Sequence, residues 1–430
     1  MSDEPQTRTL TKPPAAEAAT ATPAQGAAAP PLGVWLTRLL IVGLVLTALN
    51  LRPAITSLGA LLEEVRTGLH MSGSVAGVLT SVPPLCFAVF GLTAPRLARR
   101  FGAATVVCAG TAAIAAGLLI RPFAGGTAAF LAASALALMG IALSNVLMPV
   151  IVKRYFPDRV GTMTGLYSMA LALGTSLAAA VTVPMTSALG GDWRTGLGVW
   201  AVLALLAVVP WIPVVRDRDG TAPAPDTATA GESAANGAPR IVRSRTAWAL
   251  ACFFGLQATG AYITMGWLPQ IFRDAGVPAG TAGVLLAVTM VMGVPLAFVI
   301  PRVAGRMRQQ GPIVVVLGLC GLAGYAGLLT APAAGAWAWA LLLGVANCAF
   351  PLALTMIGMR ARSGTGVVRL SAFAQSVGYL ISIPGPILVG ALYQHSGGWN
   401  VPLALMAGLV VPQMVAGVLA GRDRTIEDEA

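Results

Sequence analysis

An arginine inside an apolar stretch is the feature of this sequence that most directly suggests chemistry. Residues 49–59 read LNLRPAITSLG, within a run that is otherwise mostly apolar from Leu39 to Leu62. The guanidinium of Arg52 stays charged, and a charge near the centre of a bilayer costs about 2.5–3.5 kcal/mol on insertion scales. If this run crosses a membrane, Arg52 lies about 16 Å along the helix from Glu63. We therefore expect Arg52 to face a polar cavity.

The composition of the chain indicates that the run does cross a membrane. The chain has 430 residues, of which 56% are hydrophobic and only 10% charged, and its mean hydropathy is +0.78. Soluble domains carry about 25% charged residues, so a chain of this length could not cover a water-facing surface. The formal charge of +11 lies between apolar runs and is not interleaved with aromatic residues, which favours contact with anionic lipid and argues against a nucleic-acid partner.

The carboxylates of the sequence all lie outside the apolar runs, in the tails, the loops and the linker between the two halves. A carrier of cations generally needs a buried carboxylate, because a charge in a low dielectric must be neutralised by an opposite charge nearby. Arg52 also lacks such a partner, and a bound anion would supply one, since a guanidinium pairs well with carboxylate-like or linear anions. The alternative is that Arg52 is a structural clamp on backbone carbonyl groups.

Other polar side chains inside the apolar runs are candidates for the same site. Thr56 lies one helical turn after Arg52, on a stripe of small residues that includes Ala48 and Gly59. The full set expected to bind a substrate is Arg52, Thr56, Asn145, Gln257, Tyr262, Asn347, Gln375 and Tyr379. For each amide in this set the alternative is an inter-helix hydrogen bond, worth about 0.6 kcal/mol in a membrane.

Twelve runs approach the length of about 20 apolar residues that a membrane-spanning helix needs. The first half contains 35–61, 74–95, 103–121, 128–151, 163–188 and 196–215. The second half contains 247–271, 280–301, 312–331, 335–358, 369–393 and 400–420. We therefore expect an all-α membrane protein with one six-helix bundle over residues 34–215 and a second over 247–421. The remaining polar segments are expected to be a disordered tail, a linker and a short tail, over residues 1–33, 216–246 and 422–430.

The basic residues predict the orientation of these spans. One set of loops, together with the linker and the C-terminus, carries most of the Lys and Arg residues. The opposite loops carry only Arg66, Arg121, Arg194 and Arg273. We therefore expect a multi-pass protein of the cytoplasmic (inner) membrane, with both termini and the linker on the cytoplasmic side.

The two halves of the sequence repeat one another. AGVL at 76–79 recurs at 282–285, PRLARR at 95–100 recurs as PRVAGR at 301–306, and Trp193 recurs as Trp399, all at one common spacing. Asn145-x-x-x-Pro149 recurs at a similar spacing as Asn347-x-x-x-Pro351. Several unrelated matches at nearly one spacing indicate two parallel six-helix repeats, an arrangement known among secondary transporters.

Three motifs carry a family resemblance over about residues 35–421. PRLARRFG (95–102) resembles the loop between helices two and three of the major facilitator superfamily, with Arg99 where the family usually has aspartate and Pro95 where it has glycine. Together with LNLRP and FPLALTMIGMRAR (350–362), it resembles the cyanate and 2-nitroimidazole transporter branch. The resemblance implies the major facilitator fold. Its conformational switch loops would contain Arg96, Arg100, Gly102, Arg302 and Arg306.

The resemblance implies a secondary active transporter that moves a small anionic or polar solute, such as a cyanate-like or small organic anion, by alternating access. The alternative is an exporter of neutral or weakly acidic toxic compounds, similar to nitroimidazoles. A transporter-like sensor and a membrane enzyme find little support in the residues, and no metal ligands or cofactor motif stand out. We expect a monomer in the bilayer, without a cofactor, and coupling to protons is left open.

Overall fold

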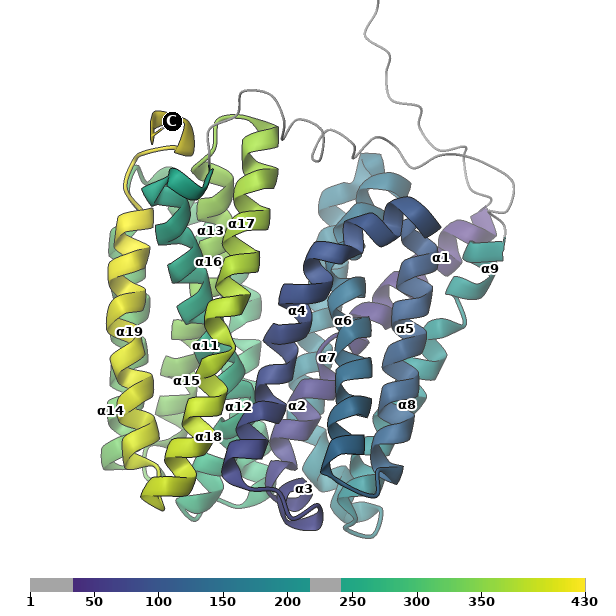
Figure 1. Ribbon diagram of the computed structural model, residues 1–430, viewed down its shortest axis with the longest axis vertical. Coiled ribbons are helices and arrows are strands. Elements are labelled where there is room, and N and C mark those ends of the chain that lie inside the picture. The colour runs from purple at the N-terminus through teal and green to yellow at the C-terminus, as the bar shows by residue number, and fades with distance from the viewer. Residues whose placement is uncertain (1–33, 217–240, 430) are drawn as a thin grey trace, which may run out of the picture.

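The computed structural model describes residues 34–216 and 241–429. The expected tail 1–33 and most of the expected linker 216–246 therefore lie outside the described residues. The predicted all-α fold is confirmed, because the described part of the chain contains helices and no strand. It also contains twelve helical spans that are long and apolar enough to cross a bilayer. Figure 1 shows these helices running roughly along one axis, in two groups.

The N-terminal bundle contains the first six spans. Its helices are α1 (Val34–Asn50), α2 (Pro53–Ala60), α3 (Leu62–Gly68), α4 (Gly73–Phe101), α5 (Ala103–Ile120), α6 (Thr127–Tyr155), α7 (Val160–Ala188), α8 (Trp193–Val208) and α9 (Trp211–Arg216). The 3-10 turns η1 (Arg121–Phe123) and η2 (Pro157–Arg159) follow α5 and α6.

The C-terminal bundle contains the last six spans. Its helices are α11 (Arg245–Asp274), α12 (Ala279–Val291), α13 (Gly293–Arg306), α14 (Gly311–Thr330), α15 (Ala336–Asn347), α16 (Ala349–Met359), α17 (Gly364–Ser382), α18 (Pro384–Ser396) and α19 (Asn400–Ala420). The 3-10 turns η3 (Ile241–Arg243) and η4 (Ile426–Glu429) lie at its two chain ends.

The two ends of the bundles differ in charge. We call the end formed by the connections after α4, α6, α13 and α16 the basic side, because it carries most of the described Lys and Arg residues. The other end, formed by the connections after α3, α5, α7, α11, α14 and α18, is called the opposite side.

The bundles meet most closely toward the opposite side. Helices α2, α4 and α7 of the first bundle pack against α11, α12, α17 and α18 of the second. A Cβ atom on Gly59 would lie 2.0 Å from the carbonyl oxygen of Met265, and one on Gly283 would lie 2.5 Å from that of Ala179. Glycine is required at both positions because the backbones approach too closely for any side chain. In Figure 1 the ribbons of the two bundles converge at the bottom and diverge toward the top.

Five of the spans are interrupted, and prolines explain the interruptions that matter for the site. Pro53 lacks an N–H group, so the carbonyl of Leu49 loses its helical donor and the first span breaks between α1 and α2. Gly174 of α7 packs against this break, since a Cβ there would lie 2.1 Å from the Leu49 oxygen. The sixth span divides at residues 209–210, between α8 and α9, and the other breaks lie at Met292, Cys348 and Ile383 in the C-terminal bundle.

The end of the described chain packs on the basic side of the C-terminal bundle. The backbone N–H of Ile426 donates to the carbonyl of Arg360 at 2.9 Å, and the Ile426 side chain is buried. The carboxylate of Glu429 accepts hydrogen bonds from the hydroxyls of Ser244 and Thr246 and from the Thr246 N–H. The segment expected as a short tail therefore caps the N-terminus of α11.

Candidate anion-binding site between the bundles

Arg52 lies at the break of the first span, between the last residue of α1 and the first of α2. It is the N-cap residue of α2, and its carbonyl accepts hydrogen bonds from the N–H groups of Ile55 and Thr56. The Thr56 hydroxyl also donates to this carbonyl, at 3.2 Å, and Thr56 is fully buried. Thr56 therefore stabilises the backbone at the break. The side chain of Arg52 is half-buried.

Two tyrosines of the C-terminal bundle face Arg52 across the bundle interface. The hydroxyl of the buried Tyr262 on α11 lies within electrostatic range of the guanidinium. Tyr379 on α17 lies within electrostatic range of both Arg52 and Tyr262. The structure thus brings together three residues that the sequence predicted for one site.

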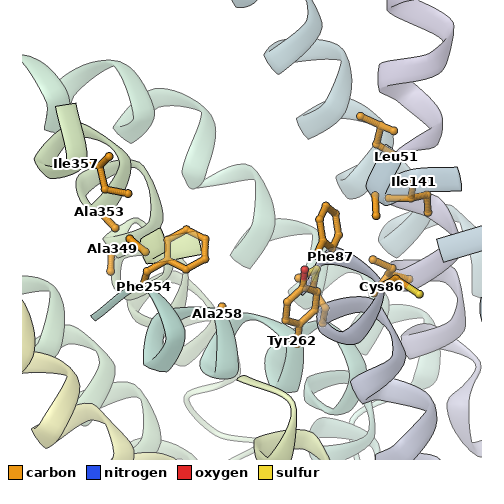
Figure 2. Packing of buried hydrophobic residues seen from close by; sticks show 14 of the residues in the cluster. Leu51, Cys86, Phe87, Ile141, Phe254, Ala258, Tyr262, Ala349, Ala353 and Ile357 are labelled. Atoms are coloured by element: carbon orange, nitrogen blue, oxygen red, sulfur yellow. The ribbon is translucent and has the colours of Figure 1, made fainter. Parts of the chain in front are cut away.

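Aromatic rings surround these tyrosines. The ring of Phe87 on α4 stacks on Tyr379 with centroids 5.1 Å apart and an interplanar angle of 22°. Phe254 on α11 meets the same ring edge-on at 5.2 Å and contacts Phe350 at 5.8 Å. Figure 2 shows Phe87 and Tyr262 at the junction between the ribbons of the two bundles. Tyr379, which lies within electrostatic range of Arg52, is therefore part of an aromatic cluster.

No carboxylate neutralises Arg52 among the residues that the structure describes. The ion pairs recorded there join Arg66 to Glu63, Arg273 to Glu64 and Arg362 to Asp428, all near the ends of the bundles. A half-buried guanidinium with apolar neighbours and no counter-charge favours an anion.

Two residues expected at the site, Gln257 and Asn347, make an inter-helix contact with each other. The Gln257 Nε2 donates to the side-chain oxygen of Asn347 at 3.2 Å and to its backbone oxygen at 3.4 Å. Pro351 explains this contact, because it lacks the N–H that would otherwise bond the Asn347 carbonyl. α15 ends at Asn347, so Gln257 supplies the donor that the broken span lacks.

The remaining expected amides, Gln375 and Asn145, make no recorded hydrogen bond to another described residue expected at the site. The Gln375 amide donates to the hydroxyl of Ser371, one turn earlier on α17, at 2.6 Å. Asn145 is half-buried, and its side chain makes no hydrogen bond with another described residue. Helix α6 continues past Pro149 without a break, unlike its counterpart in the second half.

The expected switch loops lie on the basic side. Their four arginines, Arg96, Arg100, Arg302 and Arg306, are exposed, and no ion pair joins the two loops among the described residues. Gly102 closes α4 with φ at +84°, a backbone conformation that favours glycine.

Sequence reasoning missed a second buried arginine. It assigned Arg121 to a loop on the opposite side, whereas its side chain is fully buried inside the N-terminal bundle. The Arg121 Nε donates to the hydroxyl of Ser134 and its Nη1 to the carbonyl of Ala54, each at 3.1 Å. Its guanidinium also lies 5.3 Å from the centroid of the Phe130 ring. The available signal was the spacing of Phe130 and Ser134, one turn apart on the next span.

A polar network joins the bundles at the opposite side. Arg273 at the end of α11 forms a bidentate ion pair with Glu64 on α3, with both distances 2.9 Å. Asp274 accepts hydrogen bonds from Tyr393 at 2.9 Å and from Trp399 at 2.7 Å. The hydrogen bond to Glu63 raises the pKa of Arg66, and the charge of Asp274 raises it further. Charges of α3 and α11 therefore interact across the interface.

The sequence matches known transporters over most of its length. Residues 40–382 match the family model described as Major Facilitator Superfamily. The chain is 36% identical to a Bacillus subtilis protein described as the uncharacterized transporter YycB, over 90% of this chain and 94% of that protein. It is 34% identical to the 2-nitroimidazole transporter of Escherichia coli, over 90% of this chain and 96% of that protein. It is 29% identical to the cyanate transport protein CynX of Escherichia coli, over 87% and 95%. The predicted resemblance to this branch is confirmed.

Solved structures support the same fold. The inward-open xylose transporter XylE of Escherichia coli superposes with a TM-score of 0.68, covering 90% of this chain and 95% of that chain at 14% identity. The nucleoside transporter NupG superposes with a TM-score of 0.68, covering 90% and 98% at 16% identity. At these identities the similarity concerns the fold alone.

Proposed function

The chain belongs to the Major Facilitator Superfamily, and from that membership we propose that its cargo is a small organic anion bound at Arg52. As a member of this superfamily it is a secondary transporter and not an enzyme. It moves a small-molecule solute across a membrane by alternating access, as its two six-helix bundles move about a site between them.

The observation that carries the proposal is the position of Arg52. Its guanidinium lies at a helix break on the bundle interface, within range of the hydroxyls of Tyr262 and Tyr379, and no described carboxylate pairs with it. A bound anion would neutralise the guanidinium and accept hydrogen bonds from both hydroxyls. Because these groups come from different bundles, the anion would also link the two bundles.

The aromatic surroundings favour a planar anion. The rings of Phe87 and Phe254 are buried against that of Tyr379, which is itself half-buried and lies within electrostatic range of Arg52. A planar carboxylate such as benzoate would place its charge at Arg52 and its ring beside this aromatic group. A linear ion such as cyanate would use the charge and leave the rings uncovered. We therefore place small aromatic carboxylates ahead of cyanate as cargo.

The test is the thermal stability of the purified protein with cyanate, benzoate, 4-hydroxybenzoate and 2-nitroimidazole, run in parallel on Arg52→Gln. The matched control is Arg308→Gln, which removes an exposed arginine on the basic side. We expect an anion to stabilise the wild type and Arg308→Gln but not Arg52→Gln. Equal stabilisation of all three proteins would show that Arg52 is a structural clamp.

A second candidate function is export of neutral or weakly acidic aromatic compounds. It is favoured by the same ring surfaces and by the relative named as a 2-nitroimidazole transporter. A strain that lacks the protein would then be more sensitive to 2-nitroimidazole than its parent, and stabilisation by 2-nitroimidazole would persist in Arg52→Gln. Neither result is expected for an importer of anions.

The setting of the transporter completes the proposal. We place it as a monomer in the cytoplasmic membrane, with both termini and the basic side facing the cytoplasm. The close contacts between the bundles on the opposite side then correspond to an inward-facing state. Labelling of a cysteine placed at Arg308 from the cytoplasmic side alone would support the orientation.

Proton coupling would need no buried carboxylate if the cargo carried its own proton, and a pH electrode would detect proton uptake with benzoate.

A further inference from the structure

Arg121 is a buried cation that the proposed binding site does not use. Its side chain is fully buried, and two of its nitrogens donate to Ser134 and to the backbone of Ala54. The third nitrogen, Nη2, is buried without a hydrogen-bond partner. No ion pair is recorded for Arg121 with any described residue. A charge held in this way is costly, so its contacts need an explanation.

The contact with Ala54 lies beside the site. Ala54 is the second residue of α2, and α2 begins directly after Arg52. The Nη1 of Arg121 therefore holds the first turn of the helix whose N-cap residue is Arg52. Through Ser134 and the ring of Phe130, the same guanidinium is attached to α6. The direction of α2 is thus fixed against the fourth span.

The other side of the break is held by a different residue. The Asn50 Nδ2 donates to the carbonyl of Leu203 on α8 at 3.2 Å and to that of Leu46 at 2.8 Å. Asn50 is the last residue of α1. Both helix ends that meet at Arg52 are therefore tied to the N-terminal bundle by buried hydrogen bonds.

We infer that Arg121 is a positioning residue that sets the direction of the Arg52 side chain by holding the first turn of α2. A break in a helix adds backbone freedom, and that freedom would let Arg52 turn away from Tyr262 and Tyr379. The hydrogen bond from Arg121 removes that freedom on one side. The inference rests on the proposed function for its effect on cargo binding, but the position of residue 52 is measurable without any cargo.

The first experiment measures position alone. The five cysteines are replaced by alanine, Arg52 is replaced by cysteine, and the rate of labelling by an anionic methanethiosulfonate reagent is recorded. We expect Arg121→Gln to change this rate by about tenfold, since a buried charged hydrogen bond is lost. Arg121→Lys keeps a donor for the Ala54 carbonyl, and its labelling rate should match that of the parent. An unchanged rate in Arg121→Gln would overturn the inference.

The second experiment uses the anion that stabilises the wild type among cyanate, benzoate and 4-hydroxybenzoate. We expect Arg121→Gln to raise the KM for its uptake about tenfold while kcat stays within about twofold, with recovery in Arg121→Lys. In an Arg52→Gln background the same substitution should have no further effect on KM. A purely structural residue would instead lower protein yield and thermal stability and leave KM unchanged.

The outcomes separate the two proposals. If Arg52→Gln leaves KM unchanged, the proposed function falls, whatever the labelling rates show. If Arg52→Gln raises KM but Arg121→Gln alters neither KM nor labelling, only the positioning role falls. Should Arg121→Gln fail to fold, Ser134→Ala decides, because it releases the guanidinium from α6 and so loosens the hold of Nη1 on the first turn of α2. We expect about a threefold change in labelling rate for Ser134→Ala, and no change would overturn the inference.

Discussion

Arg273 and Glu64 form a bidentate ion pair between the C-terminal and N-terminal bundles, with both distances 2.9 Å. Their side chains are 21% and 31% exposed, so water screens the pair only in part. The pair lies on the opposite side, where α3 meets the end of α11. The basic side, whose loop has Arg99 in place of an aspartate, has no such pair among the described residues. This contact therefore stabilises the state in which the opposite side is closed.

The first prediction concerns the ion pair between Arg273 and Glu64. Glu64→Gln should shift the equilibrium toward opening of the opposite side by about fivefold or less, because a partly exposed pair is worth at most about 1 kcal/mol. Distances between spin labels at Ser187 and Thr330 would report the shift. Glu63→Gln is the control, since Glu63 pairs with Arg66 on the same helix. Exchange of the two charges, Glu64→Arg with Arg273→Glu, should restore the distances between the spin labels. Unrestored distances would show that the ion pair does not stabilise closure of the opposite side.

The second prediction concerns Gly59. Gly59→Ala should prevent closure of the opposite side and abolish transport, because the new Cβ would lie 2.0 Å from the Met265 carbonyl oxygen. Transport and membrane abundance are measured together. Gly161→Ala on α7 is the matched control, since nothing lies within 4 Å of a Cβ there. Normal transport by Gly59→Ala would show that this close contact is not part of the cycle.

The third prediction concerns the tyrosines that face Arg52. Tyr262→Phe and Tyr379→Phe each remove one hydroxyl and should raise the KM for the anion by about two- to tenfold, the effect of one hydrogen bond. Uptake kinetics provide the measurement. Tyr325→Phe is the control, because that buried hydroxyl interacts with Thr264 within the C-terminal bundle. Equal effects in all three variants would argue against direct contact with the cargo.

The fourth prediction separates packing from binding at Gln257. Its amide donates to Asn347, and both residues belong to the C-terminal bundle. Gln257→Leu should therefore reduce the free energy of unfolding by about 1 kcal/mol and leave KM unchanged. Thermal unfolding and uptake are compared in one preparation. A large rise in KM without loss of stability would show that Gln257 contributes to cargo binding.

The fifth prediction concerns pH and the end of the chain. Burial opposes ionisation of Glu429, but hydrogen bonds from the Thr246 N–H and the hydroxyls of Ser244 and Thr246 outweigh it and lower the pKa below 4.5. Because the folded pKa is depressed, the stabilisation is present at neutral pH and is lost as pH falls through the lowered value. Hydrogen exchange at the Thr246 amide should accelerate in that range. In Glu429→Gln exchange should already be fast at neutral pH, and unchanged protection would contradict the prediction.

The fold followed from the sequence because a bilayer restricts the choices. Twelve apolar runs could only be spanning helices, and matches such as Trp193 with Trp399 ordered them into two halves. The prediction that Arg52 belongs to a binding site followed from the cost of a charge among apolar residues. Its two tyrosine neighbours were found because polar side chains in such runs are few.

The burial of Arg121 and the pairing of Glu64 with Arg273 could not be predicted from the sequence. Both depend on distances between spans, which no local sequence pattern contains. Arg121 stands at the end of an apolar run, where an exposed and a buried side chain have the same sequence environment. Its burial depends on Ala54 and Ser134, which belong to two other spans. The pairing of Glu64 with Arg273 likewise depends on the angle between the bundles.

The same Asn-x-x-x-Pro motif produces a continuous helix in one half and an interrupted one in the other. Helix α6 runs through Pro149, whereas the tenth span divides at Cys348, and two further spans of the second half divide at Met292 and Ile383. In the N-terminal half the first span divides at Arg52 and the sixth at residues 209–210, whereas α4 and α7, which pack against the second half, are continuous. The C-terminal half has three joints, so the two duplicated halves are not mechanically equivalent. We expect the second half to bend around the cargo while the first half rotates as one body.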